Sequence, residues 1–166
     1  MVKKWAVIIL VITLVGCDQK SKVETEIVAP NLVLIPKPSS LIMADGFFEF
    51  QKSTVIASEE ALAPLAEVVQ SYLFDLTTFQ NELVSENQTN ALILKMDTLL
   101  SPEEYQLIVT QNGIEIIGGE EIGVMHGFQT LRQMLLSGQN QNRVPVMTIQ
   151  DQPRFQWRGL LLDCSR

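Results

Sequence analysis

The chain has 166 residues, which is enough for one domain with its own hydrophobic core but not for two large domains. Hydrophobic residues make up 46% of it and charged residues 19%, so most of the chain should be globular rather than disordered. The formal net charge is −7 and no lysine or arginine cluster is present, which argues against nucleic acid as a partner.

The amino terminus has the pattern of a bacterial secretion signal. Two lysines precede an apolar stretch over residues 5–15. This stretch is shorter than the roughly 20 residues of a transmembrane helix, and it is typical of the apolar part of a signal peptide. The sequence LVGC at residues 14–17 resembles a lipobox, whose cysteine is acylated and becomes the first residue of the mature protein. The alternative is a plain signal peptide or short anchor in which the cysteine is incidental.

On the lipobox interpretation, residues 1–16 are a signal peptide, Cys17 carries the lipid, and residues 17–30 are a polar tether. The protein would then be lipid-anchored in the bacterial cell envelope and face the periplasm. Asp18 resembles a signal for retention in the inner membrane, but the choice between the inner and outer membrane stays open. Cys164 would have no partner, so no disulfide is expected.

The first half of the domain is expected to contain short strands and one helix. Two prolines make residues 32–40 an extended edge segment rather than a central strand. Short strands are predicted over 47–50 and 54–56. A helix follows over 59–77, with Ser58 as a possible N-cap and one apolar face. Pro64 requires the regular helix either to begin near it or to be kinked there.

The second half of the domain is expected to contain a hairpin, a helix and a final strand. After a strand over 91–96, the β-rich runs 105–110 and 114–118 flank Asn112-Gly113, a strong signal for a hairpin turn with positive φ. A helix is predicted over 120–137 and a strand over 144–149. The glycines of this helix, at 123 and 127, are one turn apart and predict close packing onto the sheet.

This order of elements predicts one α+β domain over residues 31–151. We expect a mostly antiparallel sheet with two helices on one face.

Two stretches resemble the family 20 glycoside hydrolases, the β-N-acetylhexosaminidases. The helix matches the family pattern G-x-x-x-G-x-Q-T-L-x-Q over residues 123–133, and residues 157–166 match W-R-G-x-x-L-D-x-S-R. In that family a small α+β domain precedes a (β/α)₈ barrel, so the resemblance implies that residues 152–166 begin the catalytic barrel with its first strand. We therefore expect the remaining barrel strands to lie beyond Arg166.

The resemblance also implies a mechanism. Family 20 enzymes are retaining exo-glycosidases in which a Glu is the general acid. The substrate's own 2-acetamido oxygen attacks the anomeric carbon, and an Asp orients this acetamido group. The mechanism therefore differs from the usual scheme with two catalytic carboxylates. That Asp-Glu pair lies beyond residue 166, so this chain should contain no catalytic residue and should be inactive alone. Three acidic pairs are present, and each is expected to lie at a helix start or in a solvated loop with a structural role: Glu59-Glu60, Glu103-Glu104 and Glu120-Glu121.

The implied substrate is an oligosaccharide ending in N-acetylglucosamine or N-acetylgalactosamine, and no cofactor or metal is expected. Barrel active sites lie at the carboxyl ends of the strands. Arg166 therefore corresponds to the family's substrate-binding arginine, whose planar guanidinium suits two adjacent hydroxyls. Asp163 would be a supporting or structural residue near that end, and Arg158 a structural residue at the opposite end.

Two other interpretations stay open. The chain could be a non-catalytic lipoprotein domain that binds glycans or another protein. It could also be the front domain of another barrel glycosidase, for example one similar to family 84, although the pattern over 157–166 favours family 20.

Overall fold

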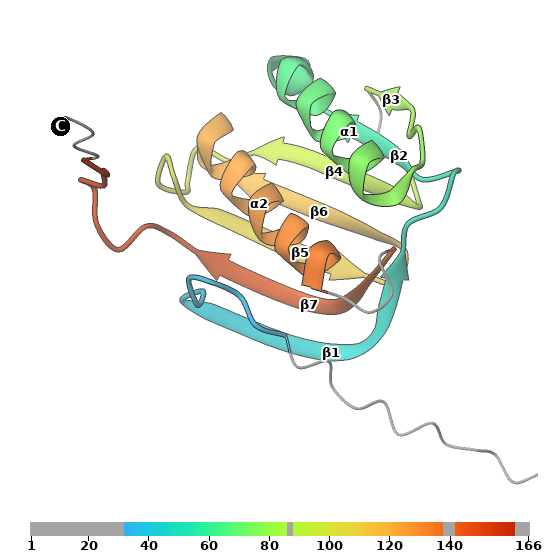
Figure 1. The fold of residues 1–166 in the computed structure, drawn as a ribbon. Coiled ribbons are helices and arrows are strands. Elements are labelled where there is room, and N and C mark those ends of the chain that lie inside the picture. The colour runs from blue at the N-terminus through green and yellow to red at the C-terminus, as the bar shows by residue number, and fades with distance from the viewer. Residues whose placement is uncertain (1–31, 86–87, 138–141, 162–166) are drawn as a thin grey trace, which may run out of the picture.

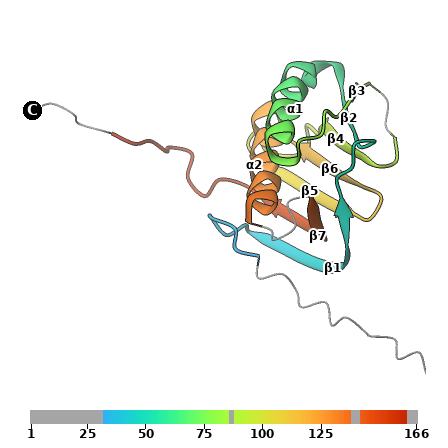
Figure 2. The same cartoon turned by 45° about the vertical axis from the view of Figure 1, so that its right-hand side comes forward.

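The computed structural model describes residues 32–85, 88–137 and 142–161. The predicted signal peptide, the acylated Cys17 and the tether all lie outside the described residues. The described chain forms two layers, a seven-stranded sheet and two helices that cover one of its faces (Figures 1 and 2). This confirms the α+β class. No helix in the described ranges is long and apolar enough to cross a membrane.

Two strands come first, then a helix, four strands, a second helix and a final strand. Their bounds are β1 Ser40–Glu49, β2 Val55–Ser58, a 3₁₀ turn Glu60–Leu62, α1 Ala63–Thr77, β3 Leu83–Val84, β4 Ala91–Met96, β5 Tyr105–Thr110, β6 Gly113–Gly118, α2 Glu121–Ser137 and β7 Arg143–Asp151.

The sheet is mixed, which corrects the prediction of a mostly antiparallel one. Its strand order is β1-β7-β5-β6-β4-β2-β3. The pairs β1–β7, β7–β5 and β5–β6 are antiparallel, whereas β6–β4, β4–β2 and β2–β3 are parallel. The sequence signalled the β5–β6 hairpin, but the parallel half depends on strands that are distant in the chain.

Both helices lie on one face of the sheet. In the chain, α1 lies between β2 and the short edge strand β3, and α2 lies between β6 and β7. Figure 1 shows α1 and α2 together in front of the sheet.

The start of α1 resolves the two possibilities at Pro64. The α-helix begins at Ala63, and the proline occupies its first turn, where a missing N–H costs nothing. Ser58 does not cap it, because Ser58 is the last residue of β2 and a 3₁₀ turn intervenes. The cap position of α1, Leu62, makes no side-chain capping hydrogen bond.

The β5–β6 hairpin forms where expected, but its turn differs from the prediction. Thr110 pairs with Gly113, so the two loop residues are Gln111 and Asn112. Neither Asn112 nor Gly113 has a positive φ. The Thr110 hydroxyl holds the turn instead, since it accepts the N–H of Asn112 (3.2 Å) and donates to the carbonyl of Gly113 (3.0 Å).

β1 is longer than the predicted strand and changes direction in its middle. Its pairing with β7 is irregular between Met43 and Phe47, where Gly46 adopts φ +107°. Glycine takes such a conformation at no steric cost. The second half of β1 therefore turns upward at the edge of the sheet, as Figure 1 shows on its right-hand side.

The hydrophobic core lies between the helices and the sheet. Alternate residues of β5 and β6 point into it, among them Leu107 and Ile116, which are fully buried. The apolar stripe predicted for the second helix is also buried, and it comprises Val124, Phe128, Leu131 and Leu135. The same is true of the main stripe of α1, which comprises Leu65, Ala66, Val69 and Leu73.

The two glycines of α2 bring its backbone against the sheet, as predicted. A Cβ on Gly123 would lie 2.4 Å from the carbonyl oxygen of Glu104 and 3.0 Å from that of Pro102. A Cβ on Gly127 would lie 2.6 Å from Cγ2 of Ile116. Contacts this short leave no room for a side chain, so both glycines are required by packing.

The segment after β7 is not a strand in its described part. Residues 152–161 have no strand pairing, and the side chains of Trp157 and Leu161 are 94% exposed. A β-strand needs a hydrogen-bonded neighbour, and no described residue pairs with this segment. The barrel strand predicted to begin at residue 157 therefore stays a prediction.

Replacing Gly123 by alanine should destabilise the domain. The new Cβ would meet backbone atoms that cannot rotate away. Overpacking against rigid backbone should cost about 2–3 kcal/mol, the upper part of the usual range, which exceeds the roughly 1 kcal/mol that alanine gains over glycine in a helix. Urea unfolding should show a net loss of about 1–2 kcal/mol for Gly123→Ala. Ser71→Ala, at an exposed position of α1, is the control and should change little. Equal stability of Gly123→Ala and the original chain would contradict the packing argument.

Tyr105 should make stability fall at alkaline pH. Burial raises the pKa of its phenol above the ordinary value, while the hydrogen bond with the Thr130 hydroxyl (2.7 Å) acts in the opposite direction. The unfolded chain therefore loses this proton first, so the stabilisation is complete below pH about 10 and is lost as the pH rises through the folded pKa. The free energy of unfolding should fall more steeply above pH about 10 in the original chain than in Tyr105→Phe. Identical slopes would exclude this assignment.

Candidate functional site

Of the predicted site residues, only Arg158 lies in the described part of the chain. Cys17, Asp163 and Arg166 fall outside it, so their predicted roles are untested by the geometry. Arg158 lies on the segment that follows β7, and its side chain is about half exposed.

Arg158 connects this segment to the loop before β5. One guanidinium nitrogen, Nη1, donates to the carbonyl of Phe155 (2.6 Å), and Nη2 forms an ion pair with the carboxylate of Glu103. The backbone carbonyl of Glu103 lies 3.3 Å from Nδ1 of His126 on α2. The arginine therefore links the exit segment to the α2 side of the domain, and its predicted structural role in a barrel stays a prediction.

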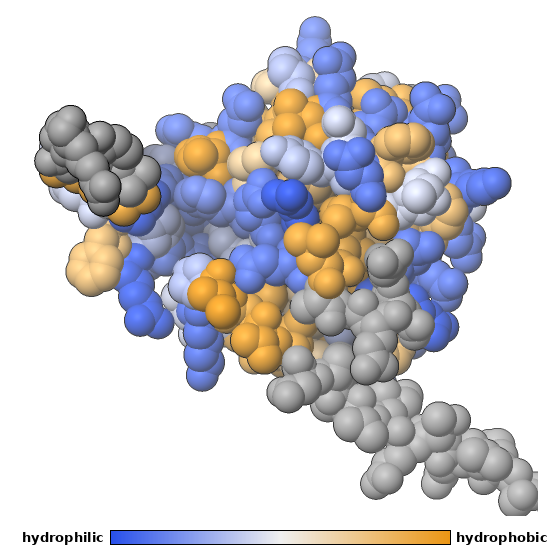
Figure 3. Space-filling view, viewed as in Figure 1, coloured by the Kyte–Doolittle hydropathy of each residue, from blue (hydrophilic) through white to orange (hydrophobic). Residues whose placement is uncertain are grey.

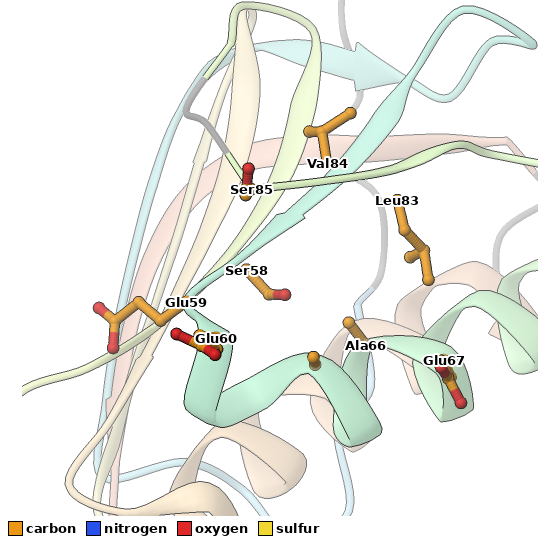
Figure 4. A pocket seen from close by; sticks show the side chains of 9 residues that line it. Ser58, Glu59, Glu60, Ala66, Glu67, Leu83, Val84 and Ser85 are labelled. Carbon is orange, nitrogen blue, oxygen red and sulfur yellow. The ribbon is translucent and has the colours of Figure 1, made fainter.

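The acidic pair Glu59-Glu60 borders an open pocket of about 550 Å³ between the start of α1 and the β3 segment. Figure 4 shows the carboxyl groups of Glu59 and Glu67 at opposite ends of this pocket, pointing in different directions. Carboxyl groups that do not converge cannot share a proton or hold a metal ion together. Glu59 and Glu67 therefore do not form an acid–base pair across the pocket.

The second acidic pair is also held by structural contacts. Nε2 of Gln150 donates to the Glu104 carboxylate (2.8 Å), and this hydrogen bond, followed by the one from the N–H of Ser101 (3.1 Å), holds the pKa of Glu104 below its ordinary value. Its neighbour Glu103 is paired with Arg158. Glu104 is therefore a stabilised carboxylate, which is unsuited to donate a proton as a general acid at neutral pH.

The residues of the family motif on α2 hold the scaffold together. The Thr130 hydroxyl is hydrogen-bonded to the phenol of Tyr105 on β5 (2.7 Å). Oε1 of Gln133 accepts the backbone N–H of Ile35 (3.0 Å), which ties the extended segment before β1 to the helix. These polar groups position neighbouring elements.

One feature was missed by sequence reasoning. A polar depression of about 420 Å³ lies where the second half of β1 approaches the tip of the β5–β6 hairpin. We call it the amide depression, because four side-chain amides line it, those of Gln51, Asn90, Gln111 and Asn112. No spacing in the sequence signalled it, since the four residues belong to three separate loops.

The described residues therefore define the class of the domain: a two-layer α+β scaffold without an assembled catalytic centre. No cluster of histidine, cysteine, aspartate and glutamate able to bind a metal ion occurs in the described ranges. Glu103 is ion-paired, Glu104 accepts hydrogen bonds, and the carboxyl groups of Glu59 and Glu67 point apart.

Residues 31–152 match the model of glycosyl hydrolase family 20, domain 2, and the chain belongs to this family. It is 33% identical to a β-hexosaminidase of Porphyromonas gingivalis over 97% of its own length, but it spans only 22% of that relative. The resemblance to family 20 on sequence motifs is thereby confirmed.

Solved structures agree with this assignment. An exo-β-N-acetylglucosaminidase of Vibrio harveyi, in complex with N-acetylglucosamine, matches 79% of the chain with a TM-score of 0.66 and 27% identity. A chitobiase of Flavobacterium johnsoniae matches 80% of the chain with a TM-score of 0.62 and 29% identity. The chain covers 20% and 22% of these two structures, so it corresponds to about a fifth of each relative.

Removing the ion pair of Arg158 should loosen the exit segment without unfolding the domain. Exposed ion pairs are worth about 0–1 kcal/mol, so Glu103→Gln should change the free energy of unfolding by less than about 1 kcal/mol. Chymotrypsin should nevertheless cleave near Phe155 and Trp157 about two to five times faster, because the segment loses its anchor. Glu120→Gln, a nearby acid without an ion pair in the described chain, is the control. Equal cleavage rates in both variants would contradict a tethering role.

Proposed function

We propose that this chain is the amino-terminal part of an exo-β-N-acetylhexosaminidase that removes terminal N-acetylglucosamine or N-acetylgalactosamine from oligosaccharides. The observation that carries the proposal is the match of residues 31–152 to domain 2 of family 20, followed by the WRGLLLDCSR sequence at 157–166. Each relative named above is a hexosaminidase or chitobiase of which this chain covers about a fifth.

In the proposed enzyme the domain is a support for a catalytic barrel. Residues 152–166 begin that barrel, and the Asp-Glu pair of substrate-assisted retaining catalysis lies beyond them. Arg166, at the carboxyl end of the first barrel strand, grips two adjacent hydroxyls of the terminal sugar through its planar guanidinium. Asp163 supports that end, and no cofactor or metal takes part.

The outer surface of the helix layer is compatible with a neighbouring domain. Apolar side chains are exposed there on both helices, including Val68 and Phe74 of α1 and Ile122 and Leu136 of α2. Figure 3 shows apolar groups gathered among polar ones on this side of the molecule. Exposed apolar patches are frequent where a domain contacts another part of its protein.

The proposed location is the bacterial cell envelope, with the domain facing the periplasm. The support is the LVGC sequence at 14–17 after a short apolar stretch, with Cys17 as the acylated residue. Stable attachment needs more than one acyl chain, because each buried CH₂ contributes only about 0.8 kcal/mol.

The proposal is tested by extracting the native protein from membranes with detergent. Its intact mass should be several times the 18.6 kDa of this chain and should include acyl groups, and it should hydrolyse an aryl N-acetyl-β-glucosaminide. The 166-residue chain alone should release no product, because it lacks the catalytic pair. A native mass near that of the processed chain would favour a non-catalytic lipoprotein, and turnover by the short chain would contradict the assignment of catalysis to later residues.

A further inference from the structure

We propose that the amide depression is an accessory binding site for a neutral oligosaccharide, separate from any catalytic centre. The depression has a volume of about 420 Å³, within the range of about 300–1,000 Å³ that is usual for small-molecule sites. Unlike most such sites it is lined mainly by polar side chains. An apolar ligand would leave these groups unsatisfied, so the lining selects a ligand rich in hydroxyl or amide groups.

The charge of the lining excludes anions and metal ions as ligands. No lysine or arginine borders the depression, and its one carboxylate, that of Glu49, is already paired with Arg143 at 3.1 Å. A phosphate or carboxylate ligand would need a cation or a helix amino terminus, and a divalent cation would need several free oxygen ligands of which some are charged. Neutral polar ligands are the class that remains.

The side-chain amides offer the hydrogen bonds that sugar hydroxyls require. A primary amide carries two donors and an oxygen acceptor, and it can therefore both donate to and accept from hydroxyl groups. Gln111 and Asn112, at the exposed tip of the hairpin, make no side-chain hydrogen bond within the described chain. Their donors and acceptors are free for a ligand.

A third amide is held rigidly in place. Asn90 has φ 57°, its Oδ1 accepts the hydroxyl of Thr54 (3.0 Å), and its Nδ2 donates to the hydroxyl of Ser53 (3.1 Å). Its backbone N–H donates to the carbonyl of Asn112 (2.7 Å), which connects it to the hairpin tip. One N–H of the amide stays available, in a fixed direction, so little side-chain entropy would be lost on binding.

The bend of β1 completes the depression. Gly46, with φ +107°, lies in this bend. A Cβ on it would lie only 2.4 Å from Nε2 of Gln111, so the bend lies directly against the Gln111 amide. Phe47, the next residue, also lines the depression, and the guanidinium of Arg143 lies 5.7 Å from the centre of its ring, on one side of it. Aromatic rings offer an apolar surface for the C–H face of a sugar, while the amides meet its hydroxyls.

The experiment uses the 166-residue chain, purified in detergent, with chitotriose as the probe. The choice of an N-acetylated sugar rests on the proposed function. Saturation-transfer NMR, which detects weak binding through the signals of the ligand, should show transfer from the protein to chitotriose. In the double variant Gln111→Ala/Asn112→Ala, binding should weaken about tenfold, since each lost hydrogen bond to a ligand has a modest effect.

Gln152→Ala is the matched control, because it removes an exposed amide beyond the opposite end of β7. It should bind like the original chain, and thermal unfolding should show that all variants are folded. Absence of transfer to the original chain, or equal transfer to the double variant, would overturn the proposal. This experiment measures sugar binding and does not depend on catalytic activity. Lack of activity in the native protein would count against the proposed hydrolase function, but it would not affect the NMR test of the accessory site.

Discussion

The close contact between α2 and the sheet is the constraint on which the rest of the domain depends. Gly123 places the helix backbone against the carbonyl of Glu104, and Gly127 places it against Ile116. A side chain at either position would lift the helix and separate Phe128 and Leu131 from the core, where both are fully buried. Because α2 is also the connection between β6 and β7, its position decides where the last strand enters the sheet.

The same contact organises the polar groups around it. Thr130, on the turn after Gly127, reaches the phenol of Tyr105, and His126 lies beside the carbonyl of Glu103. Glu103 in turn holds Arg158 of the exit segment. The residues of the family motif on α2 thus attach neighbouring elements to one another.

The opposite end of the sheet has a different character. There the loops before β4 and between β5 and β6 meet the bend of β1, and they bring together amides from three places in the chain. This surface is polar and has no net cationic character, whereas the outer helix surface exposes apolar residues such as Phe74. The domain therefore presents two chemically distinct surfaces, one polar and one with exposed apolar residues.

The sequence by itself determined the helices, the hairpin and the family. Val124 and Leu135 follow the period of a helix with one buried face, and Tyr105 alternates with polar neighbours as a half-buried strand does, so local pattern was sufficient. Only the tertiary structure decided the parallel pairing of β2, β4 and β6, the hairpin turn held by Thr110, and the meeting of Asn90 with Asn112. The strand pairing and the contact between Asn90 and Asn112 depend on residues far apart in the chain, and they carry no local signal. The turn held by Thr110 is local, but its side-chain hydrogen bonds replace the positive φ that Asn112-Gly113 predicted.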